Sequence, residues 1–292
     1  VMADLALLAL FAGLYSVPMY ALIQMRAQPS HRSRIIAANN ILNALFMIAS
    51  AAMAALLLKA GVTVPQLFLI TGLLNLLVAG YIFLVVPEYL LRFIAWIATR
   101  LVYRFEVRGD EHIPTEGAAI LVCNHVSFVD AILLMAASPR PIVFIMDHRI
   151  FKLPVLGTLF RLAKAVPIAP QKEDPQAYEQ AFARAKAVLD AGDLLCIFPE
   201  GAITRDGQLG EFKGGVMKLL EANPVPVVPL ALQNLWGSFF SRIEGGAAMV
   251  RPFRRGLFSP VGLVAGPALS ATDVTPAGLR EKVAGLLAKE GL

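Results

Sequence analysis

Three long apolar runs near the start of the sequence constrain the fold more than any other feature. They span residues 5–24, 41–58 and 64–86, which makes them 20, 18 and 23 residues long. A helix needs about 20 predominantly apolar residues to cross the hydrocarbon core of a bilayer. No stretch between the runs supplies the polar face that a soluble domain would use to cover them. Residues 1–87 are therefore predicted to form three transmembrane helices.

Most of the charge lies in the remainder of the chain. The sequence is 57% hydrophobic and 16% charged, whereas about 25% of the residues of soluble domains are charged. Residues 1–87 hold four basic residues and one acidic residue, and residues 88–292 hold the other 22 and 20. About 200 residues are enough for one soluble domain. The first run is not expected to be a signal peptide, because no basic residue precedes it and no small-residue cleavage site closes it.

The basic residues of the short loops predict the orientation of the helices, because arginine and lysine accumulate on the cytoplasmic side of a membrane. The loop at residues 25–40 contains Arg26, Arg32 and Arg34, whereas the loop at residues 59–63 contains one lysine. Three further arginines follow the third run. The first loop and everything beyond residue 87 are therefore expected to lie in the cytosol.

The apolar runs contain Pro18, Asn43 and Asn75. The two asparagines are expected to hydrogen-bond between helices, the alternative being a water path. Three such helices would form a poor bundle alone, so we expect them to end a longer transporter. The strings G-L-Y-S-V-P-M-Y-A-L-I-Q and H-R-S-R-I-I-A-A-N-N-I-L-N-A resemble the last three helices of a major facilitator superfamily transporter of the lysophospholipid-transporter type. The resemblance covers about residues 3–86 and implies a cytosolic end.

Residues 88–107 are predicted to form an amphipathic helix that joins the two parts. At about 100° per residue, Arg92, Arg100 and Arg104 fall on one basic face of an otherwise apolar helix that carries Trp96 and Tyr103. Such a helix suits the membrane interface. The alternative is a helix that covers the soluble core, and both can hold at once.

Short aliphatic runs alternate with helical patterns over the rest of the chain. Strand-like runs lie at residues 118–123, 141–146, 165–169, 194–198, 225–232, 247–252 and 261–266, and helical patterns at 129–137, 174–190, 214–222 and 276–289. This alternation predicts an α/β domain over residues 108–292, with a mixed sheet, covering helices and active residues at strand-to-helix turns. Cys123 and Cys196 lack C-x-x-C spacing and are expected to be core residues.

The segment N-H-V-S-F-V-D, residues 124–130, directly follows the first of these strands. On one continuous helix, His125 and Asp130 would point about 140° apart. They can meet if His125 stays in the turn and Asp130 lies in the first helical turn, where the helix dipole favours a carboxylate. Asp130 would then accept from one imidazole nitrogen and leave the other free to deprotonate a hydroxyl. A purely structural pair is the alternative, and Ser127 is expected to be an N-cap rather than a nucleophile.

Two further strings follow. F-P-E-G at residues 198–201 places Glu200 and Gly201 at a strand exit, where side chains and backbone N–H groups reach a ligand. P-V-V-P at residues 226–229 is a strand that contains proline. In the order N-H-x-x-x-x-D, F-P-E-G, P-V-V-P, the chain resembles the glycerolipid acyltransferase family, which includes 1-acylglycerol-3-phosphate acyltransferases. The resemblance spans about residues 88–290.

The resemblance implies a role for each matching residue. His125 and Asp130 correspond to the base and its orienting carboxylate, which promote direct attack of a lipid hydroxyl on an acyl thioester. The acceptor-binding site corresponds to Glu200 and Gly201, with Arg205 and Lys213 as further substrate contacts. Acyl-carrier protein or coenzyme A would carry the acyl group, and neither a metal ion nor another cofactor is expected. A helix N-terminus after His125 would suit the oxyanion.

The sequence departs from the family pattern at two positions. Pro170, in A-V-P-I-A-P, stands where the family often has an arginine that contacts the acceptor phosphate. Arg205 follows Glu200 by five residues instead of the usual three. Both V-P-I-A-P and F-P-E-G-x-I-T resemble the acyltransferase half of bacterial acyl-carrier-protein synthetase/2-acylglycerophosphoethanolamine acyltransferases. The nearby cations Arg161, Lys164 and Lys172 are interpreted as solvated surface charge.

These observations predict an enzyme that acylates lysophospholipids at the cytoplasmic face of a bacterial inner membrane. Lysophosphatidylethanolamine and lysophosphatidylglycerol are the expected acceptors. One alternative is a 1-acylglycerol-3-phosphate acyltransferase that makes phosphatidic acid, and another is a transporter fragment with a non-catalytic soluble domain. A nucleic-acid partner is not expected, because arginine and lysine form no basic or aromatic stripe.

Overall fold

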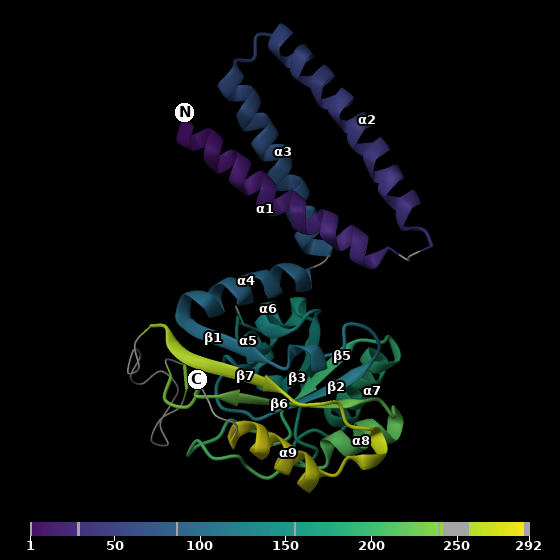
Figure 1. The fold of residues 1–292 in the computed structure, drawn as a ribbon, viewed down its shortest axis with the longest axis vertical. Coiled ribbons are helices and arrows are strands. Elements are labelled where there is room, and N and C mark those ends of the chain that lie inside the picture. The colour runs from purple at the N-terminus through teal and green to yellow at the C-terminus, as the bar shows by residue number, and fades with distance from the viewer. Residues whose placement is uncertain are drawn as a thin grey trace. The chain divides into compact units, whose positions relative to one another are not determined.

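The computed structural model describes residues 2–27, 30–85, 87–154, 156–238, 240–241 and 257–288. The chain divides into two compact units, residues 1–80 and 81–292. Figure 1 shows the helices of the first unit and the helix-covered sheet of the second.

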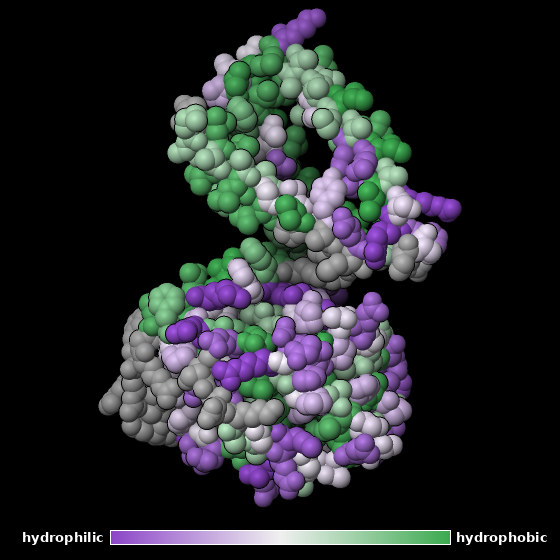
Figure 2. Space-filling model, in the orientation of Figure 1, coloured by the Kyte–Doolittle hydropathy of each residue, from purple (hydrophilic) through white to green (hydrophobic). Residues whose placement is uncertain are grey.

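The first unit is helical and strongly apolar. Its helices are α1 (Met2–Arg26), α2 (Arg32–Lys59) and α3 (Val64–Val85), the last of which extends into the second unit. Their visible faces are mostly hydrophobic (Figure 2). Two of them, α2 and α3, are long and apolar enough to cross a membrane, and the apolar stretch of neither helix is buried within the protein. In α1 the apolar stretch among the described residues, Met2–Leu14, is shorter than a span, so the prediction of three spans is supported for two helices.

One predicted interhelical contact is present in this unit. The amide nitrogen of Asn43 donates to the hydroxyl of Tyr20, 2.5 Å away, and so links α2 to α1. In a bilayer, which offers no competing water, such a bond would favour association of the two helices.

The predicted amphipathic helix ends earlier than expected. Helix α4 covers Pro87–Val102, and the chain then continues as strand β1, Tyr103–Arg108. Strand β1 alternates aromatic or aliphatic residues with charged ones, which is the period of a strand, and pairs in parallel with β7, Ser259–Ala265. The helix prediction for residues 103–107 is therefore wrong, and Arg104 does not share a helical face with Arg92 and Arg100.

The second unit is built on one mixed sheet. Its other strands are β2 (Ala119–Cys123), β3 (Ile142–Asp147), β4 (Val166–Ile168), β5 (Leu194–Ile197) and β6 (Val227–Gln233). The strand order is β1-β7-β6-β2-β5-β3-β4. Only the β6–β7 pair among the described strands is antiparallel. The predicted mixed sheet is confirmed, and the predicted strand at residues 247–252 lies outside the described residues.

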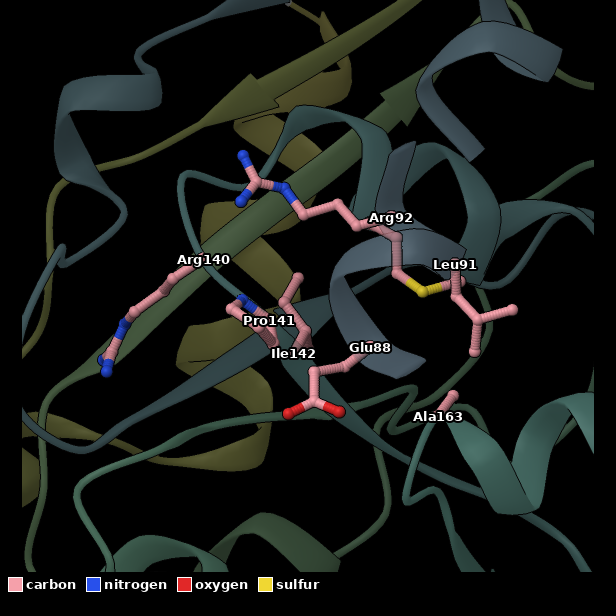
Figure 3. Close-up of a pocket in the computed structure, with 8 residues that line it drawn as sticks. Glu88, Leu91, Arg92, Arg140, Pro141, Ile142 and Ala163 are labelled. Carbon is pink, nitrogen blue, oxygen red and sulfur yellow. The ribbon is translucent and has the colours of Figure 1, made fainter. Parts of the chain in front are cut away.

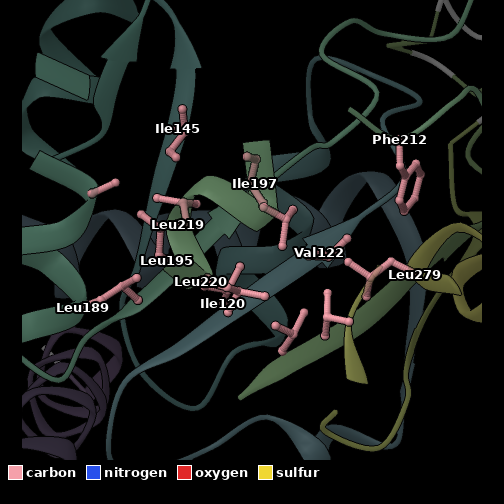
Figure 4. Packing of buried hydrophobic residues seen from close by; sticks show 14 of the residues in the cluster. Ile120, Val122, Ile145, Leu189, Leu195, Ile197, Phe212, Leu219, Leu220 and Leu279 are labelled. Carbon is pink, nitrogen blue, oxygen red and sulfur yellow. The ribbon is translucent and has the colours of Figure 1, made fainter. Parts of the chain in front are cut away.

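Helices cover both faces of this sheet. One face packs against α7 (Pro175–Asp190), α8 (Gly215–Ala222) and α9 (Pro276–Ala288), whose apolar side chains interlock with those of the strands (Figure 4). The other face packs mainly against α5 (Asp130–Ala137) and the end of α4. Cys123 and Cys196 are fully buried on this second face, and burial raises the pKa of both thiols. The prediction that they are core residues is confirmed.

Several short elements complete the unit. These are the 3-10 helices η1 (Asp110–His112), η2 (His148–Lys152) and η3 (Ala271–Asp273) and the helix α6 (Leu156–Leu162). None of these four elements was predicted from the sequence. Helix α7 was predicted, and its N-cap Asp174 accepts a hydrogen bond from the N–H of Ala177 at 2.9 Å.

The order of the strands determines where a site can form. Strands β2 and β5 are parallel neighbours near the middle of the sheet, with Ala119 opposite Leu194 and Val122 opposite Ile197. Their carboxyl ends therefore meet at the same edge. Ligands of α/β sheets bind outside the carboxyl ends of the strands, where connections leave in opposite directions. The chain leaves β2 through α5 on one face and β5 through α8 on the other.

Candidate active site

The turn after β2 begins with an asparagine that extends the pairing of the strand. The side-chain oxygen of Asn124 accepts from the N–H of Leu232 at 2.8 Å, and its amide nitrogen donates to the carbonyl of Leu232 at 3.1 Å. Asn124 is buried, so these two bonds satisfy a side chain that would otherwise be costly to place in the core. They fix the point at which His125 leaves the sheet.

His125 and Asp130 meet as the spacing predicts. Nδ1 of His125 lies 2.7 Å from Oδ2 of Asp130, with His125 in the turn and Asp130 at the first residue of α5. The Asp130 carboxylate also accepts from the backbone N–H of Val126 at 2.7 Å and of Ser127 at 3.0 and 3.1 Å. The carboxylate is therefore surrounded by donors, which compensate its burial.

This arrangement sets the hydrogen-bonding state of the imidazole. An ionised carboxylate only accepts hydrogen bonds, so in the neutral ring Nδ1 of His125 carries the hydrogen and Nε2 has the lone pair. The His125 side chain is 22% exposed, whereas that of Asp130 is 1% exposed. An imidazole nitrogen of this kind can accept a proton from a hydroxyl group, while the carboxylate stays in the core.

Phe198 fixes the plane of the imidazole. The two rings stack with their centroids 4.3 Å apart and an interplanar angle of 18°. Phe198 follows β5, so the ring that supports His125 comes from the neighbouring strand. The F of F-P-E-G was in the quoted string, but the sequence analysis gave it no role.

Glu200 connects the two turns through backbone groups. One carboxylate oxygen accepts from the N–H of His125 at 2.7 Å and the other accepts from the N–H of Gly210 at 2.9 Å. Burial raises the pKa of the Glu200 carboxyl, and the hydrogen bonds from these two N–H groups oppose that shift. Glu200 therefore positions the turn that carries His125. Its direct contact with an acceptor stays a prediction.

Gly201 and Lys213 lie against each other beside Glu200. Gly201 has φ +71°, and a Cβ atom at this residue would lie 2.5 Å from Nζ of Lys213. The backbone N–H of Lys213 donates to the carbonyl of Pro199 at 2.9 Å, which holds this lysine next to the strand exit. A side chain at residue 201 would therefore strain the backbone and displace this ammonium group. Arg205 lies exposed on the loop between Gly201 and Gly210.

Ser127 has a different role from the predicted N-cap. Its hydroxyl is buried and donates to the carbonyl of Phe240 at 2.9 Å, while Val129 occupies the N-cap position of α5. The N-cap prediction is wrong because the Asp130 carboxylate turns back to accept the free N–H groups of this turn. The N–H groups of Val126 and Ser127 are consequently occupied, so they do not serve the oxyanion.

A pocket elsewhere in this unit contains none of the predicted site residues. Figure 3 shows it lined by Glu88, Arg92 and Arg140 among other side chains. Arg92 donates to the carbonyl of Pro139 at 2.9 Å and Arg140 to that of Pro114 at 3.0 Å. These arginines hold loops together, and we assign the pocket a structural role. Among the described residues, no group of three His, Cys, Asp or Glu side chains could hold a metal ion.

Comparisons with known proteins agree with this geometry. Residues 104–233 match the sequence model of the family described as Acyltransferase. A 1-acyl-sn-glycerol-3-phosphate acyltransferase of Brassica napus is 31% identical over 133 residues, which is 45% of this chain and 38% of that protein. One from Pseudomonas aeruginosa is 32% identical over 143 residues, or 48% of this chain and 54% of that protein.

The fold comparison extends over more of the chain. The crystal structure of the 1-acyl-sn-glycerophosphate acyltransferase of Thermotoga maritima superposes with a TM-score of 0.50 and 24% identity, and covers 68% of this chain and 77% of that chain. This likeness shows a common fold. The chain matches about four-tenths to half of the length of the curated relatives named above. The similarity to the acyltransferase family thus covers residues 104–233 of this chain.

Proposed function

We propose that the protein transfers an acyl group from a thioester to the free hydroxyl of a lysoglycerophospholipid. The observation that carries this proposal is the His125–Asp130 contact, which leaves Nε2 of a partly exposed ring as the base. Nε2 takes the hydroxyl proton while the oxygen attacks the thioester carbonyl carbon. The carbon–sulfur bond then breaks, and the departing sulfur takes the proton back from the imidazolium. No covalent enzyme intermediate is required, and the buried hydroxyl of Ser127 is engaged elsewhere.

The surrounding residues keep this base in position. Asp130 stabilises the imidazolium that forms during attack, because its carboxylate lies 2.7 Å from Nδ1. Glu200 and Phe198 restrict the turn and the ring plane. Such preorganisation matters because small displacements of a catalytic group reduce the rate strongly. The acyl donor in this proposal is acyl-carrier-protein or coenzyme A thioester.

The proposed acceptor carries a phosphodiester head group, as in lysophosphatidylethanolamine or lysophosphatidylglycerol. Pro170 lies exposed just beyond β4, where the resembling family often carries a phosphate-binding arginine. A phosphodiester has one fewer titratable charge than a phosphomonoester, so it loses less from the absence of that arginine. Lysophosphatidic acid is the second candidate, because the relatives from Brassica napus and Pseudomonas aeruginosa are named 1-acyl-sn-glycerol-3-phosphate acyltransferases. Lys213 is a cation that could serve either head group.

We also propose that the catalytic unit faces the cytosol and that residues 1–87 are transporter-like helices that bring a lysolipid to it. The arginines of the first loop support this orientation. A cytosolic site would have direct access to acyl thioesters.

The first prediction concerns the base. His125→Ala should lower turnover about 10² to 10⁴ fold, because no other group replaces Nε2, and Asp130→Asn should cause a comparable loss by leaving the imidazole poorly oriented. The measurement is steady-state acyl transfer by purified full-length protein. His112→Ala is a matched control, since His112 contacts the carbonyl of Ala265 outside the site. A folded His125→Ala protein with near wild-type turnover would refute the mechanism.

The second prediction concerns orientation. A cysteine at Gln208, an exposed position, should resist a membrane-impermeant thiol reagent in intact cells and react in inverted vesicles. Cys123 and Cys196 are buried and their thiol pKa values are raised, so they should react little, and a variant without them is the control. Labelling from outside intact cells would contradict the cytosolic assignment.

The third prediction concerns the acceptor. Lysophosphatidylethanolamine or lysophosphatidylglycerol should be used in preference to lysophosphatidic acid in paired kcat/KM measurements. Pro170→Arg should shift the ratio toward lysophosphatidic acid by about 10 to 150 fold, the value of a charge-assisted arginine contact. Pro170→Gln adds length without charge and is the control. If wild-type protein uses lysophosphatidic acid at least about tenfold better than both lysophospholipids, the second candidate replaces the first.

A further inference from the structure

The exposed large hydrophobic side chains of the acyltransferase unit are unevenly distributed. Helix α4 exposes Phe93, Trp96 and Leu101, and α6 exposes Leu159 and Leu162, with exposed fractions between 37% and 63%. Within the described residues, α7, α8 and α9 expose no large hydrophobic side chain. Figure 2 shows the hydrophobic groups along α4, and Figure 1 shows α4 and α6 on the same side of the sheet. Among the described helices that cover the sheet, exposed apolar surface is therefore concentrated on α4 and α6, which marks an interaction surface.

The chain connects this surface to an apolar span. Helix α4 begins at Pro87, two residues after the end of α3, which is long and apolar enough to cross a membrane. Near the start of α4, Glu88 forms an ion pair with Lys164, whose Nζ lies 3.2 Å away. Lys164 follows the end of α6 by two residues. The chain therefore connects this span directly to α4, and the ion pair links the end of α6 to the start of α4.

The polar residues among these hydrophobic side chains are mostly basic. The guanidinium of Arg100 lies 4.7 Å from the centroid of the Trp96 ring. Lys152 and Arg161 are exposed in the segment that contains η2 and α6, and Arg161 donates to the carbonyl of Phe151 at 3.1 Å. Aliphatic and aromatic side chains mixed with cations are typical of surfaces that bind an anionic membrane interface.

The acidic groups that face this segment are paired. Glu173 contacts Arg149 at 2.5 Å and lies 3.3 Å from Nε2 of His148, and Asp147 accepts from the N–H of Arg149 at 2.8 Å. These carboxylates offset Arg149 and leave the charges of Lys152 and Arg161 to face outward. The segment therefore presents a net positive charge.

We propose that η2 (His148–Lys152) and α6 (Leu156–Leu162), here called the η2–α6 segment, form a second membrane-contacting element that lies with α4 on the anionic phospholipid surface. The membrane contact itself does not depend on the proposed function, whereas its role in bringing the acceptor to His125 does. Strand β3 is a parallel neighbour of β5, so η2 starts at the same sheet edge as the turns that carry His125 and Glu200. Contact of this segment with the leaflet places that edge where a lysolipid lies, and the acceptor reaches the base without leaving the bilayer.

The test uses the full chain in nanodiscs that contain anionic phospholipid. Single cysteines at Leu159 and Leu162 are labelled with an environment-sensitive fluorophore, and nitroxide-bearing phospholipids serve as quenchers. Glu281→Cys, exposed on α9 on the other face of the sheet, is the matched control. Quenching at Leu159 and Leu162 should exceed that at Glu281 by at least about threefold. Equal quenching at the three positions would overturn the proposal.

A second measurement distinguishes a lipid surface from a protein as the partner that this surface binds. Lys152→Glu and Arg161→Glu should each raise the apparent KM for nanodisc-resident lysolipid by about fivefold or more, the effect of one cation near an anionic surface, and leave kcat for a water-soluble short-chain acceptor unchanged. If acyl-carrier protein shields the Leu159 probe while lipid quenchers do not, the surface binds that protein and the membrane proposal fails. Because quenching needs no turnover, it gives an answer even if the protein transfers no acyl group.

Discussion

The burial of the Asp130 carboxylate is the constraint on which the rest of the site depends. A carboxylate with 1% of its side chain exposed is stable only when donors surround it. Its donors here are the N–H groups of Val126 and Ser127 and the ring nitrogen of His125, at the N-terminus of α5 where the helix dipole also favours negative charge. The hydrogen bonds to the Asp130 carboxylate therefore determine both the shape of the turn and the hydrogen-bonding state of the imidazole.

The sheet brings a second turn next to the turn that carries His125, and the two turns form the site together. Because β2 and β5 are parallel neighbours, the turn after β5 can reach the turn after β2. Glu200 does so through the backbone N–H of His125, and Phe198 does so through ring stacking. The histidine is consequently held by its side chain, its backbone and its ring face at once. A base restricted in this way loses little orientation when a substrate binds.

The sequence predicted much of this from local patterns, because short strands, turns and the five-residue spacing between His125 and Asp130 are local features. The helix that ends at Val102 was predicted too long because Arg104 continues the helical spacing of Arg92 and Arg100, whereas the strand conformation of β1 depends on pairing with the distant β7. The role of Glu200 could not be predicted, since its partners are backbone groups of two other segments. Ser127 was misassigned because its hydroxyl donates to Phe240, 113 positions away.

The central claim is that His125 and Asp130 act as one unit, and a double-mutant cycle on acyl transfer tests it most directly. His125→Ala, Asp130→Asn and the combined variant are compared by kcat/KM with the same lysolipid and acyl thioester. Residues that act together give strongly non-additive losses. Our account predicts that the double variant is no slower than His125→Ala alone, within a factor of about three. Losses that multiply would contradict it, because they would show that Asp130 contributes to turnover by a route that does not pass through His125.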